Sequence, residues 1–342
     1  MKQFLLTILF AVLFSLAALA QAPTTRVIVP LEGGTQSINI APDTYPTAQT
    51  DQSWIGMSLA SHSINNGSQS VVVLMVTVAP SSTPRSGVIK LTSNSGTTTI
   101  PVLQTTTATT VSAASYSAGK LVANSLASIF GTGFASQILA PQSLPLPITL
   151  GGVSVKIINT QTQEEASCKL LFISPTQINI HIPDHLQPGT YTILTTNADG
   201  SHASGTIALT DTAPDIFTVN QKGTGNPALL LQVNGANGSV SYQQPRTITN
   251  GTDTWTDPIN LNVQGNGYIL LFATGLGSNV NLAASYIRIN QVSYPLVYAG
   301  PQGQFAGLDQ VAFAAPTLPS GNHTAQLVIN GKAANPVVIP VQ

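Results

Sequence analysis

Short runs of Val, Ile and Thr, separated by Gly, Pro, Asn and Ser, recur along most of the chain. Runs of this composition, about four to eight residues long, are typical of β-strands, and the residues between them are those that tight turns need. Helical patterns, in which Ala, Leu, Glu and Lys repeat with a period of about 3.6 residues, are nearly absent. The chain is therefore predicted to be all-β. The predicted strands include residues 26–30, 71–78, 87–92, 98–103, 152–158, 190–195, 268–272, 286–289, 326–329 and 336–341.

The first twenty residues do not follow this pattern. Lys2 gives a short positive region, residues 4–20 are almost wholly apolar, and an Ala-Leu-Ala cleavage site ends at Ala20. This arrangement predicts a secretory signal peptide over residues 1–20. A membrane anchor is the alternative, but the apolar run is slightly short for a full span and no later segment is long and apolar enough. We expect a mature protein that begins near Gln21 and lies in the secreted fraction or the cell envelope.

Few side chains in this sequence carry a charge. Asp, Glu, Lys and Arg make up 7% of the residues and the net charge is −1, whereas globular proteins contain about 25% charged residues. Such a chain has no basic surface for nucleic acid or anionic lipid. Its single cysteine, Cys168, excludes an intrachain disulfide. Stability must come from apolar burial, and Cys168, which lies close to Leu170 and Phe172, is expected to be a reduced core residue.

The length of the mature chain, about 320 residues, suits two or three domains of about 100 residues each. A Thr-rich stretch at residues 105–110 is predicted to be a linker, and an Ala-Pro pair at residues 213–214 marks a second boundary. The predicted domains are residues 21–106, 107–212 and 213–342.

A motif recurs in the second and third of these domains. Residues 129–133 (Ile-Phe-Gly-Thr-Gly) match residues 271–275 (Leu-Phe-Ala-Thr-Gly), and further along Gln177 and Gln310 are each followed six residues later by Pro. Short strands with turn signals between them are typical of sandwiches, so the motif predicts two related β-sandwiches.

The repeat makes residue-level predictions. Phe130 should be equivalent to Phe272, and Gln177 to Gln310. The Gly that ends each Thr-Gly turn is expected to adopt a positive φ. The Gln amide is expected to hydrogen-bond to neighbouring backbone.

Longer segments of the same two domains resemble a known family. These segments are residues 111–116, 128–133, 150–153, 174–179, 213–217, 273–277 and 299–310. They resemble an uncharacterised secreted family found widely in acidobacteria, a C-terminal tandem of immunoglobulin-like units similar to the IPT/TIG type, over residues 107–342. The resemblance implies tandem immunoglobulin-like β-sandwiches and offers no catalytic residue.

The first domain resembles the BACON domain over residues 21–104. The segments that carry this resemblance are residues 53–55, 76–79, 85–89 and 100–104. BACON domains are bacterial β-sandwiches suspected of binding carbohydrate. The resemblance makes Trp54 a candidate platform for stacking on a sugar, with a buried core position as the alternative.

Two groups of side chains contain residue types that metal sites or hydrolases use. His181 and His185 are four residues apart, but Pro183 forbids the helix that would place them on one face. They are expected in a strand-end loop without a metal. The other histidines, His62, His202 and His323, are expected in surface turns.

Asp253 and Asp257 flank Trp255 in a predicted long polar loop over residues 243–258. Two carboxylates and an aromatic ring could serve a glycosidase or hold Ca²⁺ through oxygen ligands. No nucleophile elbow, Walker A motif or calcium-loop motif accompanies them. We therefore predict neither an enzyme nor a metal or cofactor site.

The candidate ligand contacts are Trp255, Asp253, Asp257 and Trp54. They lead to the prediction of a secreted or cell-surface, non-enzymatic binding or adhesion protein, with a polysaccharide or a cell-surface protein as the partner. A structural spacer without a ligand is the alternative, and a glycan-active hydrolase is a third. Exposed aromatic rings would favour binding, whereas fully buried Trp54 and Trp255 would favour the spacer.

Overall fold

The structure, a computed structural model, describes residues 25–40, 46–64, 69–94, 96–251 and 253–342, so the predicted signal peptide lies outside the described residues. Among these residues the regular structure is almost entirely β-strand, with one 3₁₀ turn, η2 (Leu282–Ala284). The strands form packed sheets, and the predicted fold class of tandem immunoglobulin-like β-sandwiches is confirmed. No helix in this part of the chain is long and apolar enough to cross a membrane.

The first sandwich encloses a core that includes Leu74, Ile89 and Val102, all of them fully buried. Alternation of apolar and polar residues along each strand turns one face of each sheet toward this core. One sheet has the order β2 (Gly34–Ile40), β5 (Gln69–Val78), β4 (Ile55–Ile64). The other sheet contains β1 (Val27–Pro30), β7 (Gly96–Thr107), β6 (Arg85–Ser93) and β3 (Thr47–Gln49).

The second sandwich is built around Phe134, Ile129 and Ile157, which are fully buried. Its first sheet has the order β14 (Lys169–Ile173), β15 (Gln177–His181), β10 (Leu126–Phe130), β8 (Thr109–Ser112). Its second sheet runs β11 (Thr149–Leu150), β12 (Val153–Asn159), β16 (Gly189–Thr196), β17 (His202–Leu209), with β13 (Glu165–Ser167) on β12 and β9 (Lys120–Leu121) on β17.

The third sandwich has its own core, which includes Phe313, Leu271 and Ile339. Its strands follow the order β20 (Val240–Gln243), β19 (Leu229–Asn234), β23 (Asn266–Thr274), β26 (Asp309–Ala314), β25 (Val292–Pro301), β24 (Tyr286–Ile289), β27 (Gly321–Ile329), β28 (Lys332–Ala333). In addition, β18 (Asp215–Ile216) pairs with β23 and β29 (Val337–Val341) pairs with β27. A separate hairpin consists of β21 (Thr247–Asn250) and β22 (Asp253–Thr256).

The repeated motif occupies the same register in the second and third sandwiches. Phe130 on β10 lies opposite Gln177 on β15, and Phe272 on β23 lies opposite Gln310 on β26, both in antiparallel pairs. A second pair of strands also corresponds between the two sandwiches. In the second sandwich β12 pairs with β16, and in the third β24 pairs with β27, both antiparallel. The register therefore agrees with the equivalence predicted from the repeat.

The turns that follow the repeated strands also agree with the prediction. Gly133 has a φ of 74° and Gly275 a φ of 78°, in the left-handed region that glycine adopts without steric cost. A Cβ at Gly275 would lie 2.3 Å from the carbonyl oxygen of Ala213, so close approach of two backbones is a second reason for glycine there.

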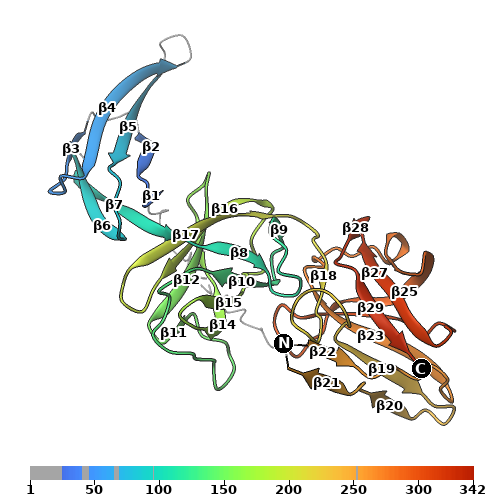
Figure 1. Cartoon of the computed structure of the whole chain (residues 1–342). Coiled ribbons are helices and arrows are strands. Elements are labelled where there is room, and N and C mark those ends of the chain that lie inside the picture. Colours follow the sequence, from blue (N-terminus) through green and yellow to red (C-terminus); the bar gives the residue numbers. More distant parts are fainter. Residues whose placement is uncertain (1–24, 41–45, 65–68, 95, 252) are drawn as a thin grey trace, which may run out of the picture.

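The Thr-rich stretch at residues 105–110 is not a linker, which corrects the prediction from composition. Strand β7 continues to Thr107 and pairs in parallel with β17 of the second sandwich, at Ala203–Thr106 and Ser204–Thr107. The sheets of the first two sandwiches thus join through one long strand, as Figure 1 shows. Threonine is β-branched and favours extended backbone, so the same composition suits a strand as well as a linker.

Side chains of both sandwiches also contact each other at this first junction. Leu103, Ile158 and Leu194 form a small buried cluster between the two sandwiches. Arg26 of the first sandwich and Lys156 of the second both form ion pairs with Glu165. Burial raises the pKa of Glu165, but the hydrogen bonds and charges of Lys156 and Arg26 outweigh it and hold that pKa below its ordinary value.

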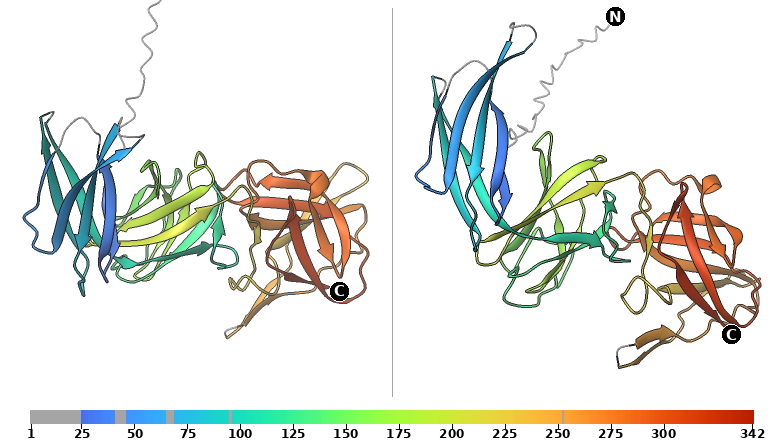
Figure 2. Two further views of the ribbon diagram at one scale, coloured as in Figure 1. Left: turned by 90° about the horizontal axis from the view of Figure 1, so that it is seen from above. Right: turned by 45° about the horizontal axis from the view of Figure 1, so that its top comes forward.

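The second and third sandwiches meet directly, with no spacer between them (Figure 2). The backbone N–H of Leu126 donates to the Thr274 hydroxyl at 2.9 Å, and that hydroxyl donates to the carbonyl of Gly307 at 2.8 Å. A Cβ at Gly307 would lie 2.8 Å from the ring of His181 and 2.9 Å from a methyl of Leu126. The contact between the two sandwiches is therefore close, and only glycine fits at this point.

The single thiol behaves as a core group. Cys168 is free, fully buried and part of the second core, and burial raises the pKa of its thiol. We expect a thiol reagent to label the native protein at least about 100-fold more slowly than the protein unfolded in guanidinium, because the thiolate is the reactive form and labelling needs local opening. Fast labelling of the native protein at neutral pH would contradict this assignment.

Candidate ligand-binding surfaces

Trp54 is packed into the edge of the first core. Its ring is half-buried, lies over Gly87, and is covered by the guanidinium of Arg85 at 4.4 Å from the ring centroid. Its Nε1–H donates to Oε1 of Gln52 at 2.9 Å. Both the face and the polar edge of the ring are therefore already engaged within the protein.

The predicted polar loop over residues 243–258 is instead a β-hairpin, which corrects the sequence interpretation. Thr247 pairs with Thr256 and Ile248 with Trp255, and the Thr249 and Thr254 hydroxyls lie 3.3 Å apart across the hairpin. Thr, Ile and Trp all favour strands, so their spacing around a Gly-containing turn explains the hairpin. It projects from the third sandwich (Figure 2).

The two faces of this hairpin differ. Thr256 faces the protein: it is buried, and its backbone N–H donates to Oδ1 of Asn226 at 3.1 Å. Thr247 and Thr256 also line a hollow of about 260 Å³, which Phe272 lines as well. Because side chains alternate along a strand, Trp255 and Asp253 belong to the opposite face. The Trp255 side chain remains 38% exposed, and Ile248 is its direct neighbour across the hairpin.

Charged groups flank this aromatic face. Arg246 donates from Nε to Oδ2 of Asp257 at 2.9 Å, so Asp257 is already paired, while Asp253 lies exposed near the turn. The structure thus places Asp253, Trp255 and Asp257 on one hairpin and Trp54 in a different sandwich. In the described part of the chain, no group of three or more His, Cys, Asp and Glu residues is placed to hold a metal ion.

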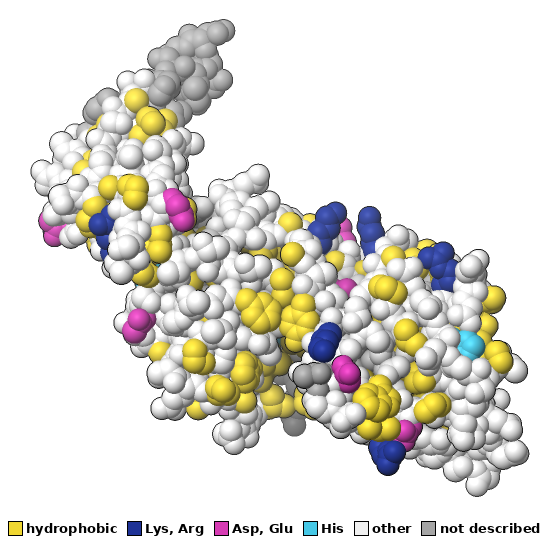
Figure 3. All heavy atoms as spheres, in the orientation of Figure 1, with side chains coloured by type: hydrophobic (Ala, Val, Ile, Leu, Met, Phe, Trp, Pro, Cys, Tyr) yellow, Lys and Arg dark blue, Asp and Glu magenta, His cyan; other side chains and the backbone are white. Residues whose placement is uncertain are grey.

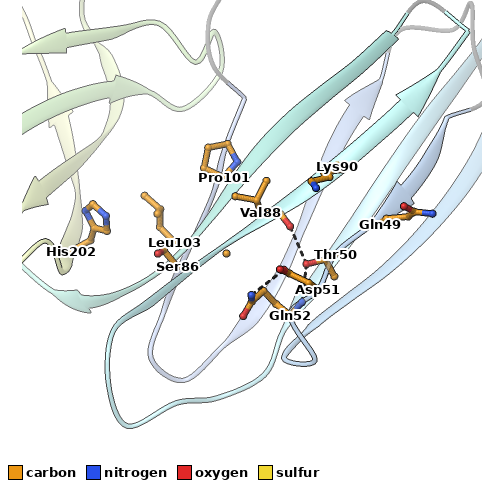
Figure 4. Close-up of a pocket in the computed structure, with 11 residues that line it drawn as sticks. Gln49, Thr50, Asp51, Gln52, Ser86, Val88, Lys90, Pro101, Leu103 and His202 are labelled. Atoms are coloured by element: carbon orange, nitrogen blue, oxygen red, sulfur yellow. Dashed lines mark hydrogen bonds between the residues drawn. The ribbon is translucent and has the colours of Figure 1, made fainter.

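A groove that sequence reasoning missed crosses the outer face of the β3–β6–β7 sheet. It has a volume of about 810 Å³ and is shown in Figure 4. Val88, Pro101 and Leu103 form its apolar side. Its polar lining is Gln49, Thr50, Asp51, Gln52, Ser86 and Lys90, with His202 from the second sandwich at one end. The alternation of Ser86, Val88 and Lys90 along β6 was the available signal, since it places these three side chains on one face.

One histidine of the predicted pair, His181, is placed differently from the prediction. His181 is buried at the end of β15 and its Nε2 lies 2.8 Å from Oδ1 of Asn124, whereas His185 is exposed beside Asp184. Burial, with the nearby charge of Lys169, lowers the pKa of His181. The two therefore do not form a metal pair.

Two of the remaining histidines are not surface turn residues. His323 is buried in β27, where its Nε2 lies 2.8 Å from the carbonyl oxygen of Pro319. His202 begins β17 and is half-buried. Both histidines lie in the first residues of strands that the sequence pattern predicted to begin later or did not predict. The side chain of His62 lies outside the described residues.

The Gln of the repeated motif also has a different partner from the one expected. Gln177 donates from Nε2 to Oδ1 of Asn179 at 2.8 Å, so its amide bonds to a side chain on the same strand and not to backbone. Backbone capping by a Gln amide occurs elsewhere: Nε2 of Gln104 contacts the carbonyl oxygens of Pro30, Leu31 and Ala79 at 3.0–3.2 Å.

The surface as a whole carries few charges and scattered hydrophobic side chains, as Figure 3 shows for one face. The exposed large side chains are Met75, Val88, Ile138, Leu144, Ile148, Val240, Tyr242, Trp255, Leu282, Val292, Val297, Tyr298 and Phe305. Of these, Trp255 has the largest aromatic ring, and it lies on an element that projects from the body of the protein.

Comparison with known proteins finds no matching family model and no matching curated protein. Among solved structures, the Bacteroides ovatus mixed-linkage glucan utilization locus protein SGBP-B, in complex with a mixed-linkage heptasaccharide, is 10% identical with a TM-score of 0.30, and the match covers 93% of this chain and 66% of that one. A titin fragment of three immunoglobulin domains is 10% identical with a TM-score of 0.20, and the match covers 93% of this chain and 95% of that one. The assignment of the fold rests on the strand pairing described above.

Proposed function

We propose that the protein is an extracytoplasmic, non-enzymatic binding protein whose contact with carbohydrate is made by the aromatic face of the β21–β22 hairpin. The observation that carries this proposal is Trp255, a large aromatic ring left partly exposed on a projecting element. Rings of this kind stack on the apolar faces of sugars, and the amphipathic indole suits a surface that is partly wet.

The groups around the ring support a polar, uncharged ligand. On one side of the ring, Arg246 and Asp257 form an ion pair in which the two charges cancel. On the other side, Asn250 and Asp253 lie at the turn of the hairpin. Amide, carboxylate and guanidinium groups can bond to sugar hydroxyls. The extracytoplasmic location is supported by the apolar N-terminal segment with its Ala-Leu-Ala site.

Replacing Trp255 with Ala tests the proposal. We expect the mature protein to bind one or more neutral polysaccharides on a glycan array, and Trp255→Ala to weaken that binding by about 10- to 100-fold, because an aromatic contact is worth about 1.5–3 kcal/mol. Isothermal titration calorimetry with the strongest array ligand measures the loss.

A matched control is available on β20, the strand that precedes the hairpin in the sequence and pairs with β19. Tyr242 on β20 is 60% exposed and lies outside the hairpin, so Tyr242→Ala removes an exposed ring and should leave binding unchanged. Trp255→Phe should retain part of the affinity. The proposal fails if no glycan binds, or if Trp255→Ala and Tyr242→Ala bind as tightly as the wild type.

The continuous β7–β17 sheet favours a second function, that of a rigid spacer built from units 21–106, 107–212 and 213–342. A strand shared between two sandwiches resists hinge motion, because bending would break its ladder of hydrogen bonds. Solution scattering on the mature chain should then fit a single bent shape. Scattering that requires an ensemble of widely different angles between the first two units would exclude the spacer.

A further inference from the structure

A small pocket lies where the second sandwich meets the third, away from the hairpin. Its volume is about 240 Å³. Tyr116, Leu171 and Asn179 line it from the second sandwich, and Phe217, Thr218 and Gln221 line it from the third. It thus combines two aromatic residues with hydroxyl and amide groups, the mixture found in small-molecule sites.

The walls of the pocket are held in place by contacts between the two sandwiches. The hydroxyl of Ser117, next to Tyr116, donates to Oδ2 of Asp215 at 3.3 Å. On the other side, the turn at Gly223 lies so close that a Cβ there would be 2.4 Å from the carbonyl oxygen of Ser115. The pocket is therefore formed before any ligand arrives, which lowers the entropic cost of binding.

Two lining residues have an unusual backbone conformation. Tyr116 has a φ of 57° and Gln221 a φ of 55°, in the left-handed region that side chains other than Asn and Asp seldom adopt. Both sit in turns that face the pocket, one from each sandwich. Strained residues of this kind occur often at ligand-binding positions.

The pocket also contains a hydrogen-bonding group that is oriented but not used. Oδ1 of Asn179 accepts from the Ser128 hydroxyl at 2.9 Å and from Nε2 of Gln177 at 2.8 Å. These two bonds fix the amide plane, and the Asn179 amide nitrogen has no hydrogen bond to the described residues. Its two N–H donors therefore remain for a ligand.

The internal repeat supplies a comparison within the same chain. By register, Asn179 corresponds to Ala312 and Ser128 to Leu270 in the third sandwich, so the polar pair is absent there. In that sandwich, Thr247 and Thr256 of the hairpin lie over the corresponding sheet face beside Phe272. Among the described residues no such hairpin lies over Phe130 in the second sandwich, and the centroids of the Phe130 and Tyr116 rings lie 5.9 Å apart.

We propose that this junction pocket binds one neutral sugar residue, such as a terminal unit of a glycan. None of its lining residues carries a charge, which disfavours uronic acids, phosphates and amino sugars with a free amine. Aromatic walls stack on the apolar face of a sugar ring, and amide N–H groups donate hydrogen bonds to the oxygens of its hydroxyls. The volume is below the range of about 300–1,000 Å³ that holds drug-sized ligands, so one ring is the appropriate size.

The test uses methyl glycosides of glucose, galactose, mannose and N-acetylglucosamine, added to the isotope-labelled mature protein. We expect at least one of them to shift the NMR signals of Tyr116 and Phe217 in a saturable manner, and methyl galacturonate to cause no such shift. Asn179→Ala, which copies the residue of the third sandwich, should weaken that binding at least tenfold. Gln221→Gly removes the other amide that lines the pocket, and glycine adopts the positive φ at this position without strain. This substitution should also weaken the binding of the glycoside.

Gln232→Ala is the matched control, because it removes a half-buried amide that bonds to Asn234 outside the pocket. The site stands apart from the hairpin, so Trp255→Ala should leave the pocket shifts unchanged even if it abolishes polysaccharide binding. The proposal is overturned if no neutral glycoside shifts these signals, if a peptide with an aromatic side chain binds there instead, or if Asn179→Ala and Gln221→Gly both bind normally.

Discussion

Replacing Phe134 with Ala is expected to lower the free energy of unfolding of the second sandwich by about 3–5 kcal/mol, the usual loss for a fully buried aromatic ring. Phe134 is among the largest fully buried side chains and packs against Gly131, where a Cβ would lie 2.5 Å from the ring. Its backbone also joins two loops, since its N–H donates to Pro175 and its carbonyl accepts from Ala198. The truncated side chain would leave a cavity that this braced turn cannot collapse to fill.

Hydrogen exchange of the amides in β10 and β15 measures this loss for the second sandwich alone, which matters because a chain of several sandwiches need not unfold in one step. Ile138→Ala is the matched control in the same sandwich, since Ile138 is 70% exposed and its truncation should change stability by less than about 0.5 kcal/mol. Equal effects of the two substitutions would show that Phe134 is not a central core residue.

Phe134 also shows how far the repeat could be read from the sequence. The recognised motif ended at Gly133 and Gly275, yet the next residues, Phe134 and Leu276, are both fully buried and belong to the cores of their sandwiches. Periodicity identified strands well, because Val and Ile alternate with polar residues wherever one face is buried. A single apolar residue after a turn carries no periodic signal, so its burial could not be predicted.

The pocket and the groove that combine residues of two sandwiches could not be predicted from the sequence, for a different reason. The junction pocket joins Tyr116 to Gln221, and the groove joins Asp51 to His202. Local patterns say which residues form a strand, but the packing of one sandwich on another decides which turns meet. The hairpin around Trp255 was missed because each of its strands has only four residues and a single apolar side chain, Ile248 or Trp255, which is too few to reveal an alternation.

The stability of the third sandwich is expected to fall by about 2 kcal/mol as the pH rises from 4 to above 6, because of one carboxyl group. Asp309 is buried in β26, and burial raises its pKa from 3.8 to about 6, although the backbone N–H groups of Leu276 and Gly275 lower it in part. Oδ2 of Asp309 accepts the Leu276 N–H at 3.0 Å.

The sign follows from proton binding in the two states. Between about pH 4 and pH 6 the folded protein keeps the proton on Asp309 while the unfolded chain has lost it, so each rise in pH within this window favours unfolding. Above the folded pKa both states are ionised and the effect is constant. Asp215, whose pKa burial also raises, acts in the same direction, whereas His181, whose pKa is lowered, acts in the opposite direction.

Asp309→Asn separates this contribution from the others. The variant retains a carbonyl oxygen for the Leu276 N–H but cannot ionise, so its stability relative to the wild type should increase by about 2 kcal/mol between pH 4 and pH 7. Hydrogen exchange of the β23 and β26 amides at a series of pH values measures the difference, and the residual slope of the variant reports on Asp215 and His181. A difference between variant and wild type that does not change with pH would mean that Asp309 ionises in the folded protein at its ordinary pKa. In that case the bonds to the backbone N–H groups would offset the cost of burial.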